Sequence, residues 1–236
     1  MAKIMLTSRE QQILRAVVNE YLHTAQPVGS RLLWTRYGFG ISPATIRSAM
    51  SALTAAGFLE QPHTSAGRVP TDRAYRLFLE NASATPSLSE QQKVTKRLEQ
   101  AATAPRAARK LAGQLSEVAG AAGVHVDADG ATSFNLANVF GQADFADPRV
   151  AGYLAELLDE SAEWLPKIAR QAGKVVIRIG SENEDFRVQA VSVMAIKVKV
   201  GEYVGYVGVV GPTRMPYQKV AALLEYGVKE LGRVYG

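Results

Sequence analysis

The hydrophobic residues of this chain repeat with two different periods, and the change between them limits the fold more than any other feature. Over residues 7–80 they recur every three or four positions, the spacing of helices that bury one side. Between residues 174 and 211 they alternate instead, which is the period of half-buried strands. The pattern predicts a helical head followed by a body of helices and antiparallel strands, and so an α+β fold.

Start and stop signals divide the head into short helices. The first predicted helix, residues 7–24, opens with the capping box T-S-R-E, and the second, residues 30–37, ends at a glycine. The third begins at Ser42-Pro43 and ends at Gly57. Two short strands joined by a loop follow, and then a fourth helix capped by Thr71. Three helices with a hairpin after the third predict a winged helix-turn-helix.

The third helix has one face suited to a DNA groove. Ile46, Met50 and Leu53 share the side that would pack on the first two helices. The opposite side carries short residues, which would let the helix backbone come close to base edges, and Arg47 could reach a guanine or a phosphate. The DNA-binding candidates on this helix are Ser42, Ala44, Thr45, Arg47, Ser48 and Ser51. A merely solvated helix is the plainer interpretation of the same pattern.

The loop after the third helix, in the stretch QPHTSAGRVPTD, supplies the remaining candidates. Its hydroxyls, small side chains and exposed N–H groups suit a phosphate backbone, and its arginine suits a narrow minor groove. His63 is also an ordinary loop residue. The candidates here are His63, Thr64, Ser65, Gly67 and Arg68.

The rest of the chain predicts a second domain. Residues 82–90 have the composition of a linker, and residues 90–122 are helical with a break near Pro105. The passage 123–135 is turn-rich and ambiguous. Helices are predicted at 148–160, 162–172 and 216–234, and three strands at 174–180, 187–200 and 202–211. We therefore expect a winged-helix domain in 1–81, a linker and helix in 82–110, and a sheet domain in 111–236.

Charge and composition narrow the function. The net charge is +5, and residues 1–80 hold nine Lys or Arg against five Asp or Glu, with arginine at eight of the nine. Arginine suits phosphates and guanine edges, so a nucleic-acid partner is favoured. The chain has no cysteine, no visible signal peptide and no apolar run of membrane-spanning length, and we expect a cytoplasmic protein without a membrane partner.

Nothing in the sequence predicts an enzyme, a cofactor or a metal site. The metal, phosphate-binding and nucleophile motifs H-E-x-x-H, G-x-x-x-x-G-K and G-x-S-x-G are absent. The histidines at 23, 63 and 125 are far apart in sequence, with no matching carboxylate motif. Asp127 and Asp129 lie in a turn-like run, where we expect them to be solvated.

Three stretches carry a family resemblance. PVGSRLL followed by SPATIRSAMSALTAAGFLEQPHTSAGRVPTDRAYR closely resembles the N-terminal domain of HrcA-type heat-inducible transcription repressors. VGVVGPTRMPYQKV resembles a C-terminal stretch of the family, and NVFGQADFADP resembles the stretch before its last GAF-like strands. Together the matches cover roughly residues 6–80 and 135–236.

The resemblance implies a repressor of chaperone genes. It would bind an inverted-repeat operator on double-stranded DNA as a homodimer, through the winged helix, and would dimerise through a GAF-like body. The chaperonin would keep it active, and heat stress would release it. Family members are usually longer, and we expect the missing part, with the first GAF strands and a dimerisation insert, to fall between Lys110 and Phe134.

Two other interpretations remain open. One is a winged-helix transcription regulator whose GAF-like body senses a small ligand, although the glycines at 201, 205, 208 and 211 form no G-x-G-x-x-G fingerprint. The other is a chaperonin-associated protein that no longer binds DNA.

Overall fold

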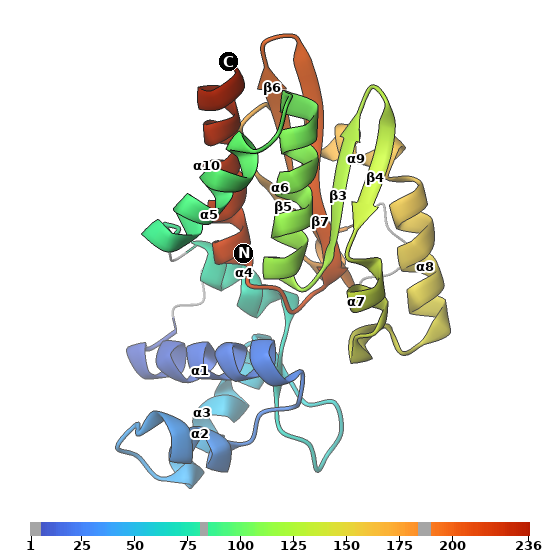
Figure 1. Ribbon diagram of the computed structural model, residues 1–236. Coiled ribbons are helices and arrows are strands. Elements are labelled where there is room, and N and C mark those ends of the chain that lie inside the picture. Colours follow the sequence, from blue (N-terminus) through green and yellow to red (C-terminus); the bar gives the residue numbers. More distant parts are fainter. Residues whose placement is uncertain (1–5, 81–84, 184–189) are drawn as a thin grey trace. The chain divides into compact units, whose positions relative to one another are not determined.

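The chain forms two compact units, which we call the head, Met1–Ala82, and the body, Ser83–Gly236. The computed structural model describes residues 6–80, 85–183 and 190–236 (Figure 1). The described residues combine helices with antiparallel sheet, so the α+β class is confirmed. In these residues no helix is both long and apolar enough to cross a membrane.

Within residues 6–80, four helices and one short hairpin build the head. The hairpin strands pair antiparallel, with Leu59 opposite Pro70 and Glu60 opposite Val69. The elements are α1 (Ser8–Thr24), α2 (Ser30–Tyr37), α3 (Pro43–Ala55), β1 (Leu59–Glu60), β2 (Val69–Pro70) and α4 (Asp72–Glu80).

The helix ends of the head are where the sequence signals predict them. Thr7 and Glu10 form the capping box of α1, in which the Thr7 hydroxyl accepts from the Glu10 N–H at 3.2 Å. The Ser42 hydroxyl accepts from the Thr45 N–H, also at 3.2 Å, and starts α3. Gly38 ends α2 at a φ of +56°, a conformation that costs glycine little. Local hydrogen bonds therefore define the helix bounds.

A buried carboxylate fixes α2 against α1. Glu20 is 6% exposed and accepts hydrogen bonds from Arg36 Nη1 at 2.6 Å and Tyr37 Oη at 3.0 Å. Burial acts to raise the pKa of Glu20, but the bonds from Arg36 and Tyr37 outweigh it and leave the pKa below its usual value. The buried Glu20 carboxylate is therefore charged and paired. Removing Arg36 or Tyr37 would leave the desolvation cost of that charge less well compensated.

In residues 85–183 and 190–236, the body contains five strands and a larger set of helices. Its helical elements are α5 (Leu88–Glu99), α6 (Ala104–Ala119), α7 (Leu136–Phe140), η1 (Ala143–Phe145), α8 (Pro148–Asp159), α9 (Ser161–Ile168), η2 (Gly180–Glu182) and α10 (Tyr217–Tyr235). Its strands are β3 (Ala122–Asp127), β4 (Gly130–Phe134), β5 (Val176–Arg178), β6 (Val191–Val200) and β7 (Tyr203–Pro212).

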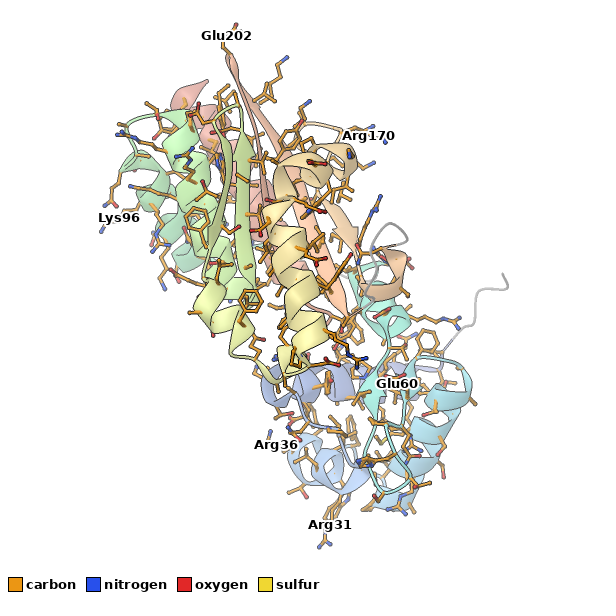
Figure 2. All side chains as sticks on the ribbon, turned by 90° about the vertical axis from the view of Figure 1, so that its right-hand side faces the viewer. Arg31, Arg36, Glu60, Lys96, Arg170 and Glu202 are labelled. Carbon is orange, nitrogen blue, oxygen red and sulfur yellow. The ribbon has the colours of Figure 1, made fainter. Side chains whose placement is uncertain are left out.

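The five strands form one antiparallel sheet between two helical layers. The strand order is β4-β3-β7-β6-β5, and the longest pairing runs from Val191 opposite Pro212 to Val200 opposite Tyr203. Figure 1 shows α6 and α10 on one face of the sheet and α8 and α9 on the other. Figure 2 labels Glu202 at the tip of the β6–β7 hairpin.

Several expectations for the body need correction. The expected loss of the first strands between Lys110 and Phe134 is wrong, because β3 and β4 form a hairpin there. Asp127, the last residue of β3, accepts from the Asp129 N–H of the turn at 3.0 Å. The expected linker 82–90 lies partly outside the described residues, and its end is already helical from Leu88. The strand predicted at 187–200 begins, within the described residues, at Val191.

The helix predicted at 162–172 also ends early, at Ile168. The reason lies in the sheet: Ala172 forms a parallel bridge with Lys197 of β6, and the Gly173 N–H donates to the Lys197 carbonyl at 3.0 Å. The backbone groups that a longer helix would have used are therefore taken by the sheet.

One glycine sets how closely α6 approaches the sheet. A Cβ on Gly123 of β3 would overlap the carbonyl oxygen of Ala112 and lie 3.0 Å from the Ser116 Cβ. The backbone of α6 cannot yield there, because Ala112 and Ser116 are themselves buried against the sheet. Gly113, on the same helix, faces only the Phe134 ring, at 3.5 Å.

We expect Gly123→Ala to lower the free energy of unfolding of the body by about 1–3 kcal/mol, because the added methyl group overpacks the contact. Gly113→Ala is the matched control and should raise it by about 0.5–1 kcal/mol, since alanine is the better helix former. Urea denaturation of the full chain measures both. Equal stability of the two variants would contradict this account of the contact.

A polar cluster lies buried under α6. His125 is fully buried, with Nε2 2.8 Å from Tyr203 Oη and 3.5 Å from Asp127 Oδ2. Arg109 Nη2 lies 3.8 Å from Asp127 Oδ1. The Asp127 side chain is only 5% exposed, so the expectation that it is solvated is wrong, whereas Asp129 is exposed. The two side chains lie on the same side of β3, because residues two apart in a strand point the same way, and tertiary packing buries them.

Burial lowers the pKa of His125 to about 4, against an attraction by Asp127 that raises it and a repulsion by Arg109 that lowers it. Among the described residues, Nδ1 of His125 has no hydrogen-bond partner, so protonation would leave a buried donor without an acceptor.

The stability of the body should therefore fall on acidification from about pH 6.5 to about pH 4. In this window His125 takes up a proton in the unfolded chain but not in the folded chain. The free energy of unfolding therefore falls by at most about 1.4 kcal/mol per pH unit. His125→Gln should flatten the curve, and His63→Gln, in the head, should not. Denaturation at several pH values measures this, and an unchanged slope in His125→Gln would contradict it.

Candidate nucleic-acid interface

Helix α3 presents a face of short side chains. Ile46, Met50 and Leu53 are buried, as their spacing predicts. The six candidates on this helix are all exposed: Ser42, Ala44, Thr45, Arg47, Ser48 and Ser51. An exposed helical face of this kind can bring its backbone close to a flat or grooved partner.

Three hydroxyls on this face are already engaged within the helix or its cap. Ser48 Oγ donates to the Ala44 carbonyl at 3.2 Å, and Ser42 Oγ lies 3.0 Å from Thr45 Oγ1. A hydroxyl that donates to its own helix still offers its lone pairs. The Ser48 hydroxyl as placed is therefore an acceptor, and it would have to turn away from Ala44 before it could donate to a phosphate.

Arg47 is the candidate that is available for an anionic partner. It is exposed at the first half of α3, and its guanidinium makes no hydrogen bond or ion pair with any residue that the structure describes. By contrast, Arg36 is bonded to Glu20, and Arg73 donates to the Ala56 carbonyl at 2.9 Å while lying 4.5 Å from the Phe58 ring centroid. Figure 2 shows Arg31 and Arg36 of α2 at the surface of the head.

Residues 61–68, which we call the hairpin loop, hold a defined conformation. Gln61 Nε2 donates to the Thr64 carbonyl at 2.8 Å and to the Ala66 carbonyl at 3.0 Å. The Ala66 N–H donates to the His63 carbonyl at 2.9 Å. His63, Thr64 and Ser65 are exposed at the tip, whereas Gly67 and Arg68 are half-buried at the base.

A groove of about 410 Å³ runs between α3 and the hairpin loop. It holds two arginines, Arg47 and Arg68, and the start of α2 forms its third wall. The lining residues are Val28, Gly29, Ser30, Arg47, Met50, Gln61, Thr64, Ser65, Ala66, Gly67 and Arg68. Of the helix candidates, Arg47 therefore lines the same groove as the loop candidates Thr64, Ser65, Gly67 and Arg68.

Sequence reasoning missed the residues that position this surface. Val28 pairs with Arg68 as an isolated antiparallel bridge, Gln61 holds the loop tip, and Thr54 accepts from Arg68 Nε at 3.1 Å. Val28 lies within the stretch PVGSRLL, which carries part of the family resemblance, but no pattern in the neighbouring residues indicates that Val28 pairs with Arg68.

No set of three or more His, Cys, Asp or Glu side chains in the described ranges could hold a metal ion. The stretches NVFGQADFADP and VGVVGPTRMPYQKV, by contrast, meet within the body: Arg214 Nη2 donates to Asp144 Oδ2 at 2.6 Å and to Gln142 Oε1 at 2.8 Å. That contact is an internal ion pair.

The fold and this surface define an α+β protein with a helical, arginine-bearing head and an antiparallel-sheet body. The family profile described as "HrcA protein C terminal domain" matches residues 71–221, which is more than half of the chain. The chain belongs to the HrcA family, and the resemblance seen in the sequence is confirmed.

Individual relatives carry one name, "Heat-inducible transcription repressor HrcA". That of Desulforudis audaxviator (strain MP104C) is 49% identical over 89 residues, covering 38% of this chain and 26% of that protein. That of Streptomyces avermitilis is 54% identical over 76 residues, covering 32% and 22%. These matches span about a quarter of the relatives' length.

One relative aligns with nearly the whole chain, at a lower sequence identity. The repressor of Erythrobacter litoralis (strain HTCC2594) is 28% identical over 338 aligned positions, covering 98% of each protein. Because this chain has only 236 residues, that alignment contains gaps in it. A crystal structure titled as that of a hypothetical protein has the same fold, with a TM-score of 0.76, 17% identity, and coverage of 98% of this chain and 99% of that one.

Proposed function

We propose that this protein is a transcriptional repressor of heat-shock genes and that its head is a winged helix-turn-helix that binds double-stranded DNA. Helix α3 lies in the major groove, and the hairpin loop is the wing on the neighbouring backbone or minor groove. Residues 1–81 form the DNA-binding domain, and residues 111–236, after the segment 82–110, form a GAF-like dimerisation domain. The interface consists of Ser42, Ala44, Thr45, Arg47, Ser48, Ser51, His63, Thr64, Ser65, Gly67 and Arg68.

One observation carries this proposal: Arg47, on the face of α3 that otherwise holds short residues, borders the same groove as Thr64 and Ser65 of the exposed loop tip. A major groove about 12 Å wide admits a helix only if its leading side chains are short. Arg47 is then the residue long enough to reach a guanine edge or a phosphate from α3. The name shared by the relatives, heat-inducible transcription repressor, supports the class of function.

A dimer fits the proposed mode of binding. Two heads related by a two-fold axis would meet an inverted repeat, with their α3 helices in successive major grooves one or two helical turns apart. The occupied promoter would exclude RNA polymerase. In this proposal the chaperonin supports the active repressor, and heat stress removes that support.

We expect Arg47→Ala to weaken binding to a specific operator by about 1–3 kcal/mol, the value of one bidentate base contact. Arg9→Ala is the matched control, because Arg9 is exposed on α1 and carries the same charge outside the proposed interface. Fluorescence anisotropy, with a footprinted genomic fragment and its shuffled version, measures both. An equal loss on both duplexes would make Arg47 a phosphate contact, and equal binding by the two variants would remove it from the interface.

The regulatory part has its own test. Genome-wide footprinting before and after heating should show occupancy upstream of chaperone genes that is lost at the higher temperature, and sedimentation should show a dimer. Occupancy unchanged by heat would contradict the heat-release mechanism but leave DNA binding intact. The alternative, a ligand-sensing body, requires a metabolite that raises the melting temperature and alters DNA affinity.

A further inference from the structure

The base of the hairpin loop is locked to the α1–α2 connection through main-chain bonds. The Val28 N–H donates to the Arg68 carbonyl at 2.8 Å, and the Arg68 N–H donates to the Val28 carbonyl at 2.9 Å. Val28 is 1% exposed, so this pair is anchored in the core of the head. A loop that leaves such a bridge starts from a fixed point.

Gly67 makes that bridge possible. A Cβ at this position would overlap the carbonyl oxygen of Val28 and lie 2.8 Å from the carbonyl carbon of Pro27. Both obstacles are backbone atoms, which cannot move aside as a flexible side chain can. The φ of Gly67 is not positive, so the glycine is required by close approach and not by backbone conformation.

The side chain of Arg68 ties the same point to α3. Its Nε–H donates to Thr54 Oγ1 at 3.1 Å, and Thr54 Oγ1 donates its own proton to the Met50 carbonyl at 2.9 Å. The hydroxyl thus accepts from the loop and donates to the helix at once. Met50 is 3% exposed and also lines the groove, so the chain of bonds ends in the core beside the proposed interface.

We propose that Gly67 and Arg68 are positioning residues, and that Arg68, anchored on Thr54, sets the place of the hairpin loop relative to α3 instead of reading DNA directly. This inference rests on the proposed function and assigns roles within it. The exposed tip residues His63, Thr64 and Ser65 make the contacts, and the base holds them in register with α3. A loop already ordered in the free protein avoids the entropy cost of ordering on binding.

Charge-preserving variants separate positioning from direct contact. Thr54→Val removes the anchor and leaves every charge in place. Arg68→Lys keeps the positive charge but has no N–H at the position of Nε. The matched control is Thr35→Val, because Thr35 Oγ1 also donates to its own helix, to the Arg31 carbonyl at 3.0 Å, whereas the Nε–H of Arg68 donates to Thr54.

We expect Thr54→Val and Arg68→Lys each to weaken binding to the footprinted fragment on the order of tenfold, the value of one charge-assisted hydrogen bond. The double variant should be no weaker than Arg68→Lys alone, because both changes break the same link. Thr35→Val should bind as the unaltered protein does. Additive losses in the double variant, or full affinity in both single variants, would overturn the positioning role.

A second measurement needs no DNA. In the free full-length protein, hydrogen exchange at the Ala66 and Arg68 amides should be slow and should speed up in Thr54→Val and in Gly67→Ala, while amides in the middle of α1 stay unchanged. Unchanged exchange in Thr54→Val would overturn the inference. If the unaltered protein bound no DNA, the proposed function would fail, and this exchange experiment would still decide whether Arg68 orders the loop.

Discussion

The pairing of Val28 with Arg68 is the contact on which the proposed interface depends. It joins the turn between α1 and α2 to the base of the hairpin loop, although 40 positions of sequence separate the two residues. Without it, the loop would leave β1 and β2, which are only two residues each and too short to hold it in one place. With it, α2, α3 and the loop line one groove, and the exposed residues of α3 and of the loop can act on a single partner.

The body relies on a different kind of contact. Its sheet is packed on both faces, and the central strand β6 is accordingly buried from Val191 to Ile196. Some polar side chains of the body pair with one another, as in the ion pair of Asp144 with Arg214, whereas Nδ1 of buried His125 has no partner among the described residues. This pair joins the two body stretches by which the family resemblance was first noticed, which gives their residue types a structural reason.

Much of the head could be predicted because its signals are local. Thr7, Ser42 and Gly38 set helix ends through bonds or backbone angles that involve only neighbouring residues. The β3–β4 hairpin was missed because each of its strands is short and its Ala- and Gly-rich sequence has no clear period. Only pairing with β7, which is distant in sequence, makes β3 a central strand.

The sequence alone determined the helices of the head, the α+β class, the family and the exposed short-residue face of α3, because periodicity, caps and motif residues are properties of adjacent positions. Tertiary structure alone decided that Asp127 is buried beside His125, that Arg68 is held by Thr54, and that Gly67 must be small. Arg68 meets Thr54, which is 14 residues away, and the burial of the His125–Asp127 pair involves Tyr203, which is 78 residues from His125. Packing sets these distances, and a single sequence carries no local signal for them.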